Sequence, residues 1–309
     1  MATIKADTAA PAAGQRLFGF MEALAGRLAR HGRTRTSETY RAALGSFRQF
    51  RRGEDIALDR LTADIMEDYQ AWLHGRGVVR NTVSFYARIL RAAYNRAVEQ
   101  GLTPDRRPFR HVYTGVDKTV RRALPLPLVR ALSRLDLSAE PAQDYARDMF
   151  LMSFFLRGMS FIDMALLRKT DLKDGYITYR RRKTGRLLVI AWTPEMRQLL
   201  GKYPENRSGY LLPVIRRAGT DERRACRNAA YNINRNLKKI GARLGAALPL
   251  TLYVARHSWA TAARARNIPL SVISEGMGHD SEATTRIYLA SLDTAVVDRA
   301  NAVIIRSLR

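Results

Sequence analysis

Apolar residues recur every three or four positions through most of the chain, which is the spacing of one buried face on an α-helix. In the first third of the chain this spacing predicts four helices, over about residues 15–32, 37–50, 62–75 and 81–101. Thr62 suits the N-cap of the third helix, and the glycines at 75 and 77 suit its end. Further along, the same spacing predicts helices over about 124–135, 138–156, 160–167, 194–202, 223–244, 251–266, 271–277, 282–289 and 293–307.

Near the middle of the chain the spacing of apolar residues changes to every second position. Residues 176–181 and 187–192 read as strands, and the tripeptide Lys183-Thr184-Gly185 lies between them. Two such runs around a turn that contains glycine predict a β-hairpin. The expected fold class is therefore mainly α, with an all-α first domain and a mainly helical second domain that contains a small antiparallel β-sheet.

Length and composition divide the chain into two domains joined by a linker. A chain of 309 residues suits one large or two ordinary domains. Residues 1–14 are Ala-rich without a long apolar run, so we expect a flexible leader and not a signal peptide. Residues 104–122 are basic, contain two prolines and show little periodicity, so we expect a linker between a domain over 15–103 and a domain over 123–309. The last predicted helix carries apolar residues that suit packing on its own domain and docking on a neighbouring copy equally: Val296, Val297, Ala300, Val303 and Ile304.

The charge of the chain points to a polyanionic partner. It has 53 Lys and Arg against 28 Asp and Glu, a net charge of +25 at pH 7. The basic residues are interleaved with ordered apolar patterns, which favours a folded nucleic-acid-binding surface over a generic basic surface. One helix stripe contains no acid and is expected to contact DNA phosphates through its arginines, solvation being the alternative: Arg80, Ser84, Arg88, Arg91 and Asn95.

Other classes of protein are disfavoured by what the sequence lacks. The single cysteine, Cys226, excludes a disulfide framework and a cysteine-based zinc site. The five histidines form no metal-ligand cluster by spacing, so no metal or other cofactor is expected. No apolar run approaches the roughly 20 residues of a membrane helix. We therefore expect no membrane association and a cytoplasmic, nucleoid-associated protein.

Three residues near the C-terminus have a spacing that suits phosphodiester chemistry. Arg256, His279 and Tyr288 are separated by 23 and 9 residues. A tyrosine hydroxyl can attack a phosphate if a cationic site stabilises the developing phenolate, and arginines supply the forked donors that a pentavalent phosphate needs. Lys183, at the tip of the predicted hairpin, can give a proton to the leaving 5′ oxygen. Taken singly, Tyr288 and Lys183 are better explained as a core tyrosine and a solvated turn lysine. Arg256 can be one more surface arginine, and His279 can equally be a helix-capping histidine.

Over about residues 120–292 the chain resembles the tyrosine recombinase (phage integrase) family. The family's Arg-His, Leu-Gly-His-X-Ser and X-Thr-Thr-X-X-Tyr motifs are matched by Arg256–Thr261, Met277–Ser281 and Ala283–Tyr288, and its catalytic lysine turn by Lys183-Thr184-Gly185. The N-terminal helices resemble the family's core-binding, SAM-like domain in pattern and order. The resemblance implies Tyr288 as the nucleophile, Arg256 as the second catalytic arginine, Lys183 as the general acid and His279 as the later motif histidine.

Two positions depart from the family pattern. The histidine usual three residues before the second arginine is Tyr253, whose phenol titrates near pH ~10 and so suits positioning and not base catalysis. The family's first arginine is replaced by Ser160, which suits a helix N-cap with Asp163 three residues on. We expect Arg157, close to one helical turn earlier, to reach the phosphate instead, with Arg147 in reserve. This variant segment resembles the integrase branch found on conjugative and invertible elements.

The resemblance implies a site-specific recombinase. Tyr288 would form a 3′-phosphotyrosine, and four protomers on two double-stranded DNA sites would exchange strands, with room for a host DNA-bending protein as an accessory partner. The leader has no room for an arm-binding domain, which favours a simple recombinase. A monomeric type IB topoisomerase and a DNA-binding protein that has lost catalysis are the alternatives. Ser160 and Tyr253 favour the latter, whereas the complete Lys, Arg, His and Tyr set argues against it.

Overall fold

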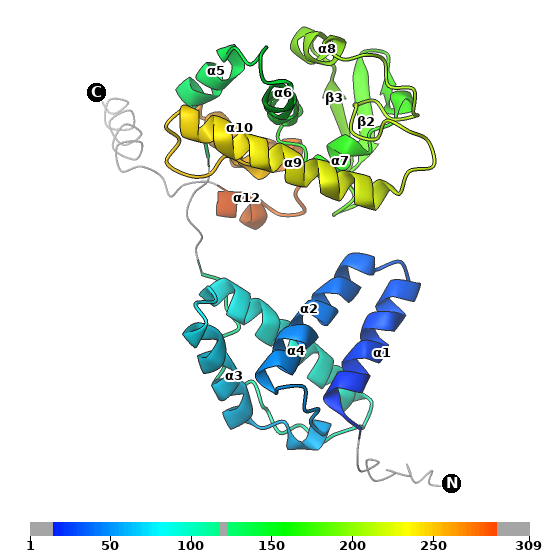
Figure 1. The fold of residues 1–309 in the computed structure, drawn as a ribbon, viewed down its shortest axis with the longest axis vertical. Coiled ribbons are helices and arrows are strands. Elements are labelled where there is room, and N and C mark those ends of the chain that lie inside the picture. Colours follow the sequence, from blue (N-terminus) through cyan, green and yellow to red (C-terminus); the bar gives the residue numbers. More distant parts are fainter. Residues whose placement is uncertain (1–14, 118–122, 289–309) are drawn as a thin grey trace, which may run out of the picture. The chain divides into compact units, whose positions relative to one another are not determined.

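The computed structural model describes the main chain of residues 15–117 and 123–288, and the side chains of these residues as far as 285. The predicted leader over 1–14 and the predicted tail helix over 293–307 lie outside this part of the chain. Two compact units are formed, one within residues 1–119 and one within residues 120–309 (Figure 1). Each unit has its own hydrophobic core.

The first unit is all-α, as the sequence predicted. Its helices are α1 (Leu17–Arg30), α2 (Thr34–Phe50), α3 (Ala63–Gly75) and α4 (Arg80–Glu99), with a short 3-10 turn at Leu58–Arg60 between α2 and α3. The hydroxyl of Thr62 accepts the Ile65 N–H, which confirms it as the N-cap of α3. Phe47 lies at the centre of the core, where its ring meets Tyr69 edge to face at 5.0 Å.

Part of the segment expected as a linker packs on this unit. Phe109 and Val112 are buried in the first core. The Tyr94 hydroxyl donates to the Pro104 carbonyl at 2.9 Å and accepts the Arg106 N–H at 3.0 Å. The chain therefore continues to contact the first unit well beyond residue 103.

The second unit is mainly helical with one small sheet. Its helices are α5 (Leu126–Arg134), α6 (Pro141–Phe155), α7 (Phe161–Ala165), α8 (Pro194–Gly201), α9 (Glu222–Arg243), α10 (Leu252–Ala265), α11 (Leu270–Gly276) and α12 (Glu282–Tyr288). The strands β1 (Leu172–Lys173), β2 (Tyr176–Arg180) and β3 (Leu187–Ala191) form an antiparallel sheet in the order β1-β2-β3. The mainly α fold class and the predicted hairpin are thus confirmed.

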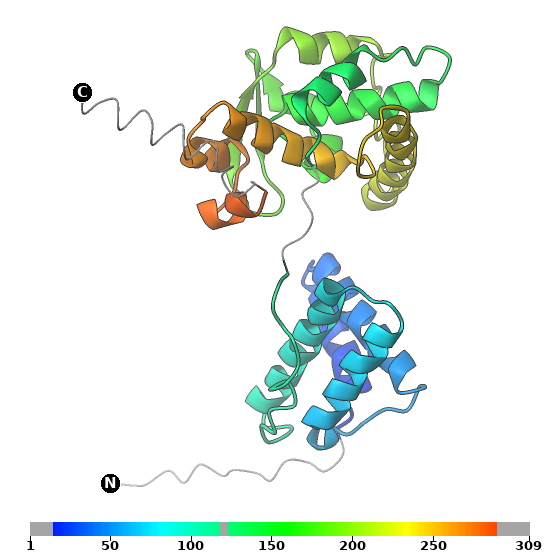
Figure 2. The same cartoon turned by 90° about the vertical axis from the view of Figure 1, so that its left-hand side faces the viewer.

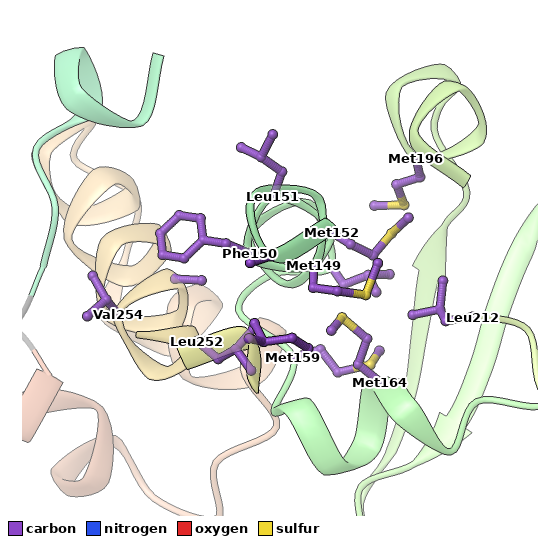
Figure 3. Packing of buried hydrophobic residues seen from close by; sticks show 14 of the residues in the cluster. Met149, Phe150, Leu151, Met152, Met159, Met164, Met196, Leu212, Leu252 and Val254 are labelled. Atoms are coloured by element: carbon purple, nitrogen blue, oxygen red, sulfur yellow. The ribbon is translucent and has the colours of Figure 1, made fainter. Parts of the chain in front are cut away.

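Helix α6 runs through the middle of the second core. Its buried residues Met149, Phe150 and Met152 lie between α10 on one side and the sheet and α8 on the other (Figure 3). Because α6 is covered on several sides, it buries eight consecutive residues, 146–153. The sequence pattern placed its start at 138, which is wrong by three residues, because Pro141 occupies the first helical turn and sets the start.

Helix α12 ends the described part of the chain. It contacts α10 and α11, and both views show it beside them (Figures 1 and 2). The main chain of α12 extends to Tyr288, where the sequence placed the attacking hydroxyl. Within residues 15–117 and 123–288, no helix combines the length and the apolar character that a bilayer crossing requires.

Candidate active site

The turn after α6 places a glycine directly against Arg256. Arg157 and Gly158 both adopt left-handed conformations, with φ of 57° and 70°. The Gly158 N–H closes the turn on the Ser153 carbonyl at 2.8 Å. A Cβ at position 158 would lie 2.7 Å from the Arg256 Cα, so this approach requires glycine.

Arg256 lies at the centre of the site and is held by backbone oxygens. Its side chain is buried, Nη1 donates to the Gly158 carbonyl at 2.7 Å, and Nη2 donates to the Met277 carbonyl at 2.8 Å. Nη2 also lies 2.7 Å from Nε2 of His279. The site thus joins the end of α6, helix α10 and the turn after α11 through one guanidinium.

The protonation of His279 follows from its two partners. A guanidinium can only donate, so Nε2 accepts from Arg256 and the ring proton lies on Nδ1. Nδ1 is 2.7 Å from Oγ1 of Thr285, which therefore accepts this proton. Burial, followed by the nearby charges of Arg256, Arg181 and Lys183, lowers the pKa of His279 to about 3. The ring is neutral near pH 7 and suits holding Arg256 better than removing a proton.

The β2–β3 hairpin is fastened to the main chain beside His279. Arg181 is buried and its Nη1 donates to the Gly278 carbonyl at 2.5 Å, while Nη1 of Arg186 donates to the His279 carbonyl at 2.9 Å. A Cβ on Gly278, whose φ is 64°, would lie 2.8 Å from Cδ1 of Leu188, so the close approach depends on this glycine.

Lys183 is carried by this docked hairpin. It is exposed at the tip, and its charge acts on His279. At the base of the tip the Arg182 N–H donates to Asp163 Oδ1 at 3.0 Å, and Ser160 donates to Oδ2 of the same carboxylate at 2.7 Å. Ser160 is the N-cap of α7, as predicted. The serine at the family's arginine position therefore helps to hold the lysine-bearing hairpin.

Arg157 and Arg147 have different surroundings. Arg157 is half-buried, and its Cδ lies 3.7 Å from the place of a Cβ on Gly276, the last residue of α11. Burial raises the pKa of Tyr179, and the charges of Arg256, Arg181 and Arg157 act against this rise.

Arg147 instead belongs to a buried ion-pair cluster. It donates to Asp148 at 3.0 Å, to the Leu135 carbonyl at 2.5 Å and to Asp144. Lys202 lies against the same two carboxylates. These contacts give Arg147 a structural role in the second unit, and the role of Arg157 at a phosphate stays a prediction.

Two tyrosines complete the predicted set. The ring of Tyr253 is half exposed on α10 and meets the His257 ring edge to face at 4.7 Å. Tyr288 lies at the end of α12, one helical turn after Thr285, and its side chain is outside the described part. The roles of both tyrosines remain predictions.

Arg181 and Thr285 are site residues that the sequence reasoning missed. Arg181 continues the alternation of Ile177 and Tyr179, the buried positions of β2, so the period of two could have marked it as inward-facing. Thr285 is fully buried, although a threonine in a short polar helix gives no sequence signal of burial.

The polar stripe on α4 is partly covered by residues 113–117, here called the strap. Ser84 is fully buried and donates to the Gly115 carbonyl at 2.5 Å. Asn81 exchanges hydrogen bonds with the main chain of Asp117, at 3.1 and 2.8 Å. Ser84 is therefore not available to DNA in this arrangement.

The arginines of the stripe differ in their partners. Arg80 pairs with Asp117 at 3.7 Å and lies 4.0 Å over the Tyr113 ring, and Arg91 donates to Thr114 at 3.1 Å. The sequence predicted a stripe without acidic residues. This is wrong for the folded surface, because the strap brings Asp117 to Arg80. Arg88 is exposed, and the side chains of Arg80 and Arg91 also remain exposed.

No group of three or more His, Cys, Asp or Glu side chains within residues 15–117 and 123–285 is arranged to hold a metal ion. The site is instead a group of cationic and neutral nitrogens: the guanidiniums of Arg157, Arg181 and Arg256, the ammonium of Lys183 and the ring of His279. Such a set suits a phosphate oxyanion.

Each of the two units matches a known protein family. Residues 16–112 match the model of the phage integrase SAM-like domain, and residues 128–295 match that of the phage integrase family. Tyrosine recombinase XerA of Thermococcus kodakarensis is 28% identical over 174 residues, which are 55% of this chain and 59% of XerA. The matched part thus spans less than two thirds of that relative.

Solved structures of integrases share the fold. A lambda integrase tetramer bound to a Holliday junction superposes with a TM-score of 0.69 at 16% identity, over 94% of this chain and 82% of that chain. The Tn1549 transposon integrase in complex with a circular intermediate DNA gives 0.67 at 15% identity, over 95% and 100%.

Proposed function

Because the chain belongs to the phage integrase family, we propose that it is a site-specific tyrosine recombinase that cleaves and rejoins duplex DNA through a 3′-phosphotyrosine. The observation that carries this proposal is the meeting of four separate segments around Arg256 and His279. These are the turn after α6, the lysine-bearing hairpin, helix α10 and the start of the helix that contains Tyr288.

The chemistry follows from the groups at the site. The Tyr288 hydroxyl gives its proton to solvent water, and its oxygen attacks phosphorus and forms the O–P bond as the bond from phosphorus to the 5′ oxygen breaks. Lys183 gives its proton to that 5′ oxygen, which leaves as a hydroxyl. Arg256 and Arg157 stabilise the charge of the pentavalent phosphate. In the second step a 5′ hydroxyl returns its proton to Lys183 as its oxygen attacks the phosphotyrosine, and the bond from phosphorus to the Tyr288 oxygen breaks, with water reprotonating the released phenolate.

His279 supports this reaction through Arg256. Its Nε2 accepts from the guanidinium, and the depressed pKa of the ring keeps it neutral across the physiological range. A neutral acceptor fixes the arginine without adding a charge beside the phosphate. Tyr253 is half exposed on the same helix as Arg256, which suits a hydrogen bond from its phenol to the DNA backbone.

The proposal assigns double-stranded DNA as the partner of both units. Residues 15–103 bind the core site, with Arg80, Arg88 and Arg91 on phosphates, and residues 123–309 carry out cleavage. The exposed arginines of α4 and the net charge of +25 support this assignment. By analogy with the lambda tetramer on a Holliday junction, four protomers act on two sites on the nucleoid DNA, with room for a host DNA-bending protein.

A strand-exchange assay tests the function. The DNA flanking the gene is first sequenced to identify short inverted repeats. A plasmid carrying two copies of such a repeat is then incubated with the protein in EDTA, and recombinant products are scored. Recombination with wild type and its loss in Tyr288→Phe support the proposal. Relaxation of a supercoiled plasmid without these repeats would favour a type IB topoisomerase. A specific protein–DNA complex without cleavage would favour a DNA-binding protein that has lost catalysis.

A further inference from the structure

Thr285 connects the helix that carries Tyr288 to the rest of the candidate site. We propose that Thr285 is a positioning residue for DNA cleavage, whose hydroxyl holds the His279 ring and thereby fixes the place of α12. The inference rests on the proposed function, because it concerns how the helix of the attacking tyrosine is held. Thr285 lies three residues before Tyr288, which is close to one helical turn.

The main chain at His279 is fixed on several sides. Its N–H donates to the Ser274 carbonyl at 3.0 Å, and its carbonyl accepts from Arg186 at 2.9 Å. The preceding carbonyl, of Gly278, accepts from buried Arg181. These bonds come from α11 and from the hairpin, so His279 is a rigid point to which another element can be attached.

Both nitrogens of the His279 ring are also engaged. Nε2 accepts from Arg256 at 2.7 Å, and Nδ1 donates to Thr285 at 2.7 Å. The ring therefore links the guanidinium expected on the phosphate to the helix expected to carry the nucleophile. A shift of Thr285 would move α12 relative to Arg256. Cleavage requires the attacking Tyr288 oxygen and the stabilising Arg256 guanidinium to hold a fixed geometry relative to each other.

Helix α12 depends on this attachment. Its described part has seven residues, and a helical segment of that length is not stable without tertiary contacts. Over residues 281–285 the other side chains are exposed or half-buried, whereas Thr285 is fully buried. The neighbouring hydroxyl of Thr284 lies 3.3 Å from that of Ser281, a contact local to the helix start. Thr285 is thus the buried anchor of the described side chains of α12.

Three variants test the inference. Thr285→Val keeps the shape of the side chain and removes the acceptor, Thr285→Ser restores a hydroxyl, and Thr284→Val is the matched control one position away. The measured quantities are the single-turnover rate of covalent DNA attachment at saturating DNA, the Kd for the same DNA, and the His279 ring protons by ¹H–¹⁵N NMR without DNA. Circular dichroism of each variant reports its folding.

The valine variant should cleave roughly 10- to 100-fold more slowly, because a buried N–H without its acceptor disfavours the productive arrangement. The serine variant should recover most of the rate, the control should cleave like wild type, and the Kd of all three should stay close to the wild-type value. In wild type, NMR should show the ring proton on Nδ1, slow to exchange with water, and in the valine variant that proton should exchange faster.

Three results would overturn the inference: wild-type cleavage by a folded valine variant, a serine variant as slow as valine, or a ring proton on Nε2 in wild type. The last result is obtained without DNA and applies even if the valine variant does not fold. Failure of the proposed function gives a different pattern. In that case wild type forms no covalent adduct, or Tyr288→Phe still forms one, whatever the ring proton shows.

Discussion

Replacing Arg157 by glycine is expected to slow cleavage strongly while leaving the fold about as stable as before. Arg157 has a φ of 57°. A left-handed conformation costs a residue with a Cβ about 1–2 kcal/mol, which glycine avoids. Glycine in turn makes the unfolded chain more favourable by about 0.4–1 kcal/mol. The two effects nearly cancel, so the free energy of unfolding should change by about 1 kcal/mol or less.

The rate of cleavage should respond strongly to the same change. Losing one charge-assisted donor to a transition-state oxyanion costs about 2.7–4 kcal/mol, or roughly 10²–10³ in rate. Arg157→Lys should lie between wild type and glycine, because an ammonium keeps the charge without the planar fork. Arg197→Ala is the control, since it removes one exposed arginine from α8.

The assay is single-turnover cleavage of a nicked DNA substrate, followed on denaturing gels beside urea unfolding of each variant. DNA affinity should stay within a few-fold of wild type. A stable Arg157→Gly protein that cleaves like wild type would show that the charge missing at position 160 is supplied from elsewhere. A large loss of stability in that variant would contradict the argument from the backbone.

Four further results are expected. Gly158→Ala should abolish cleavage and destabilise the fold, because its Cβ would lie 2.7 Å from the Arg256 Cα; urea unfolding and the cleavage assay check this. Arg147→Ala should lower the free energy of unfolding by about 3 kcal/mol, because it breaks a buried ion-pair cluster, with cleavage by the folded protein kept. The pKa of His279 falls from 6.5 to about 3 on folding, so unfolded protein binds more protons between these values. The contribution of neutral His279 to the free energy of unfolding is therefore complete above pH 6.5 and is lost as the pH falls toward 3. The loss should be on the order of 2 kcal/mol between pH 7 and 5, and urea unfolding of wild type and of His279→Gln at both pH values measures it. Arg88→Ala should flatten the log–log salt dependence of DNA binding by about one unit, whereas Asp117→Ala, which frees Arg80, should strengthen binding.

The sequence predicted the elements well because their signals are local. Apolar spacing located the helices, and the change of period with a glycine turn located the hairpin at Lys183. The N-caps Thr62 and Ser160 were also visible, since a cap depends on residues three positions away. The motif residues Arg256 and His279 do lie side by side.

The contacts that organise the site were not predictable in this way. Arg181 and Gly278 are 97 residues apart in the chain, and their close approach depends on how the hairpin packs against the turn after α11. Similarly, the strap that brings Asp117 to Arg80 comes from a segment that composition alone marked as linker. The left-handed turn at Arg157 is also set by packing, because Gly158 must fit against Arg256.

We expect DNA to become covalently joined to Tyr288, and mass spectrometry of the trapped complex tests this most directly. A nicked substrate carrying a repeat identified beside the gene is incubated with the protein in EDTA, the adduct is digested with trypsin and nuclease, and the nucleotide-bearing peptide is sequenced. We expect a single modified peptide, with the phosphate on the oxygen of Tyr288. Modification of another residue, or an adduct that forms equally in Tyr288→Phe, would contradict it.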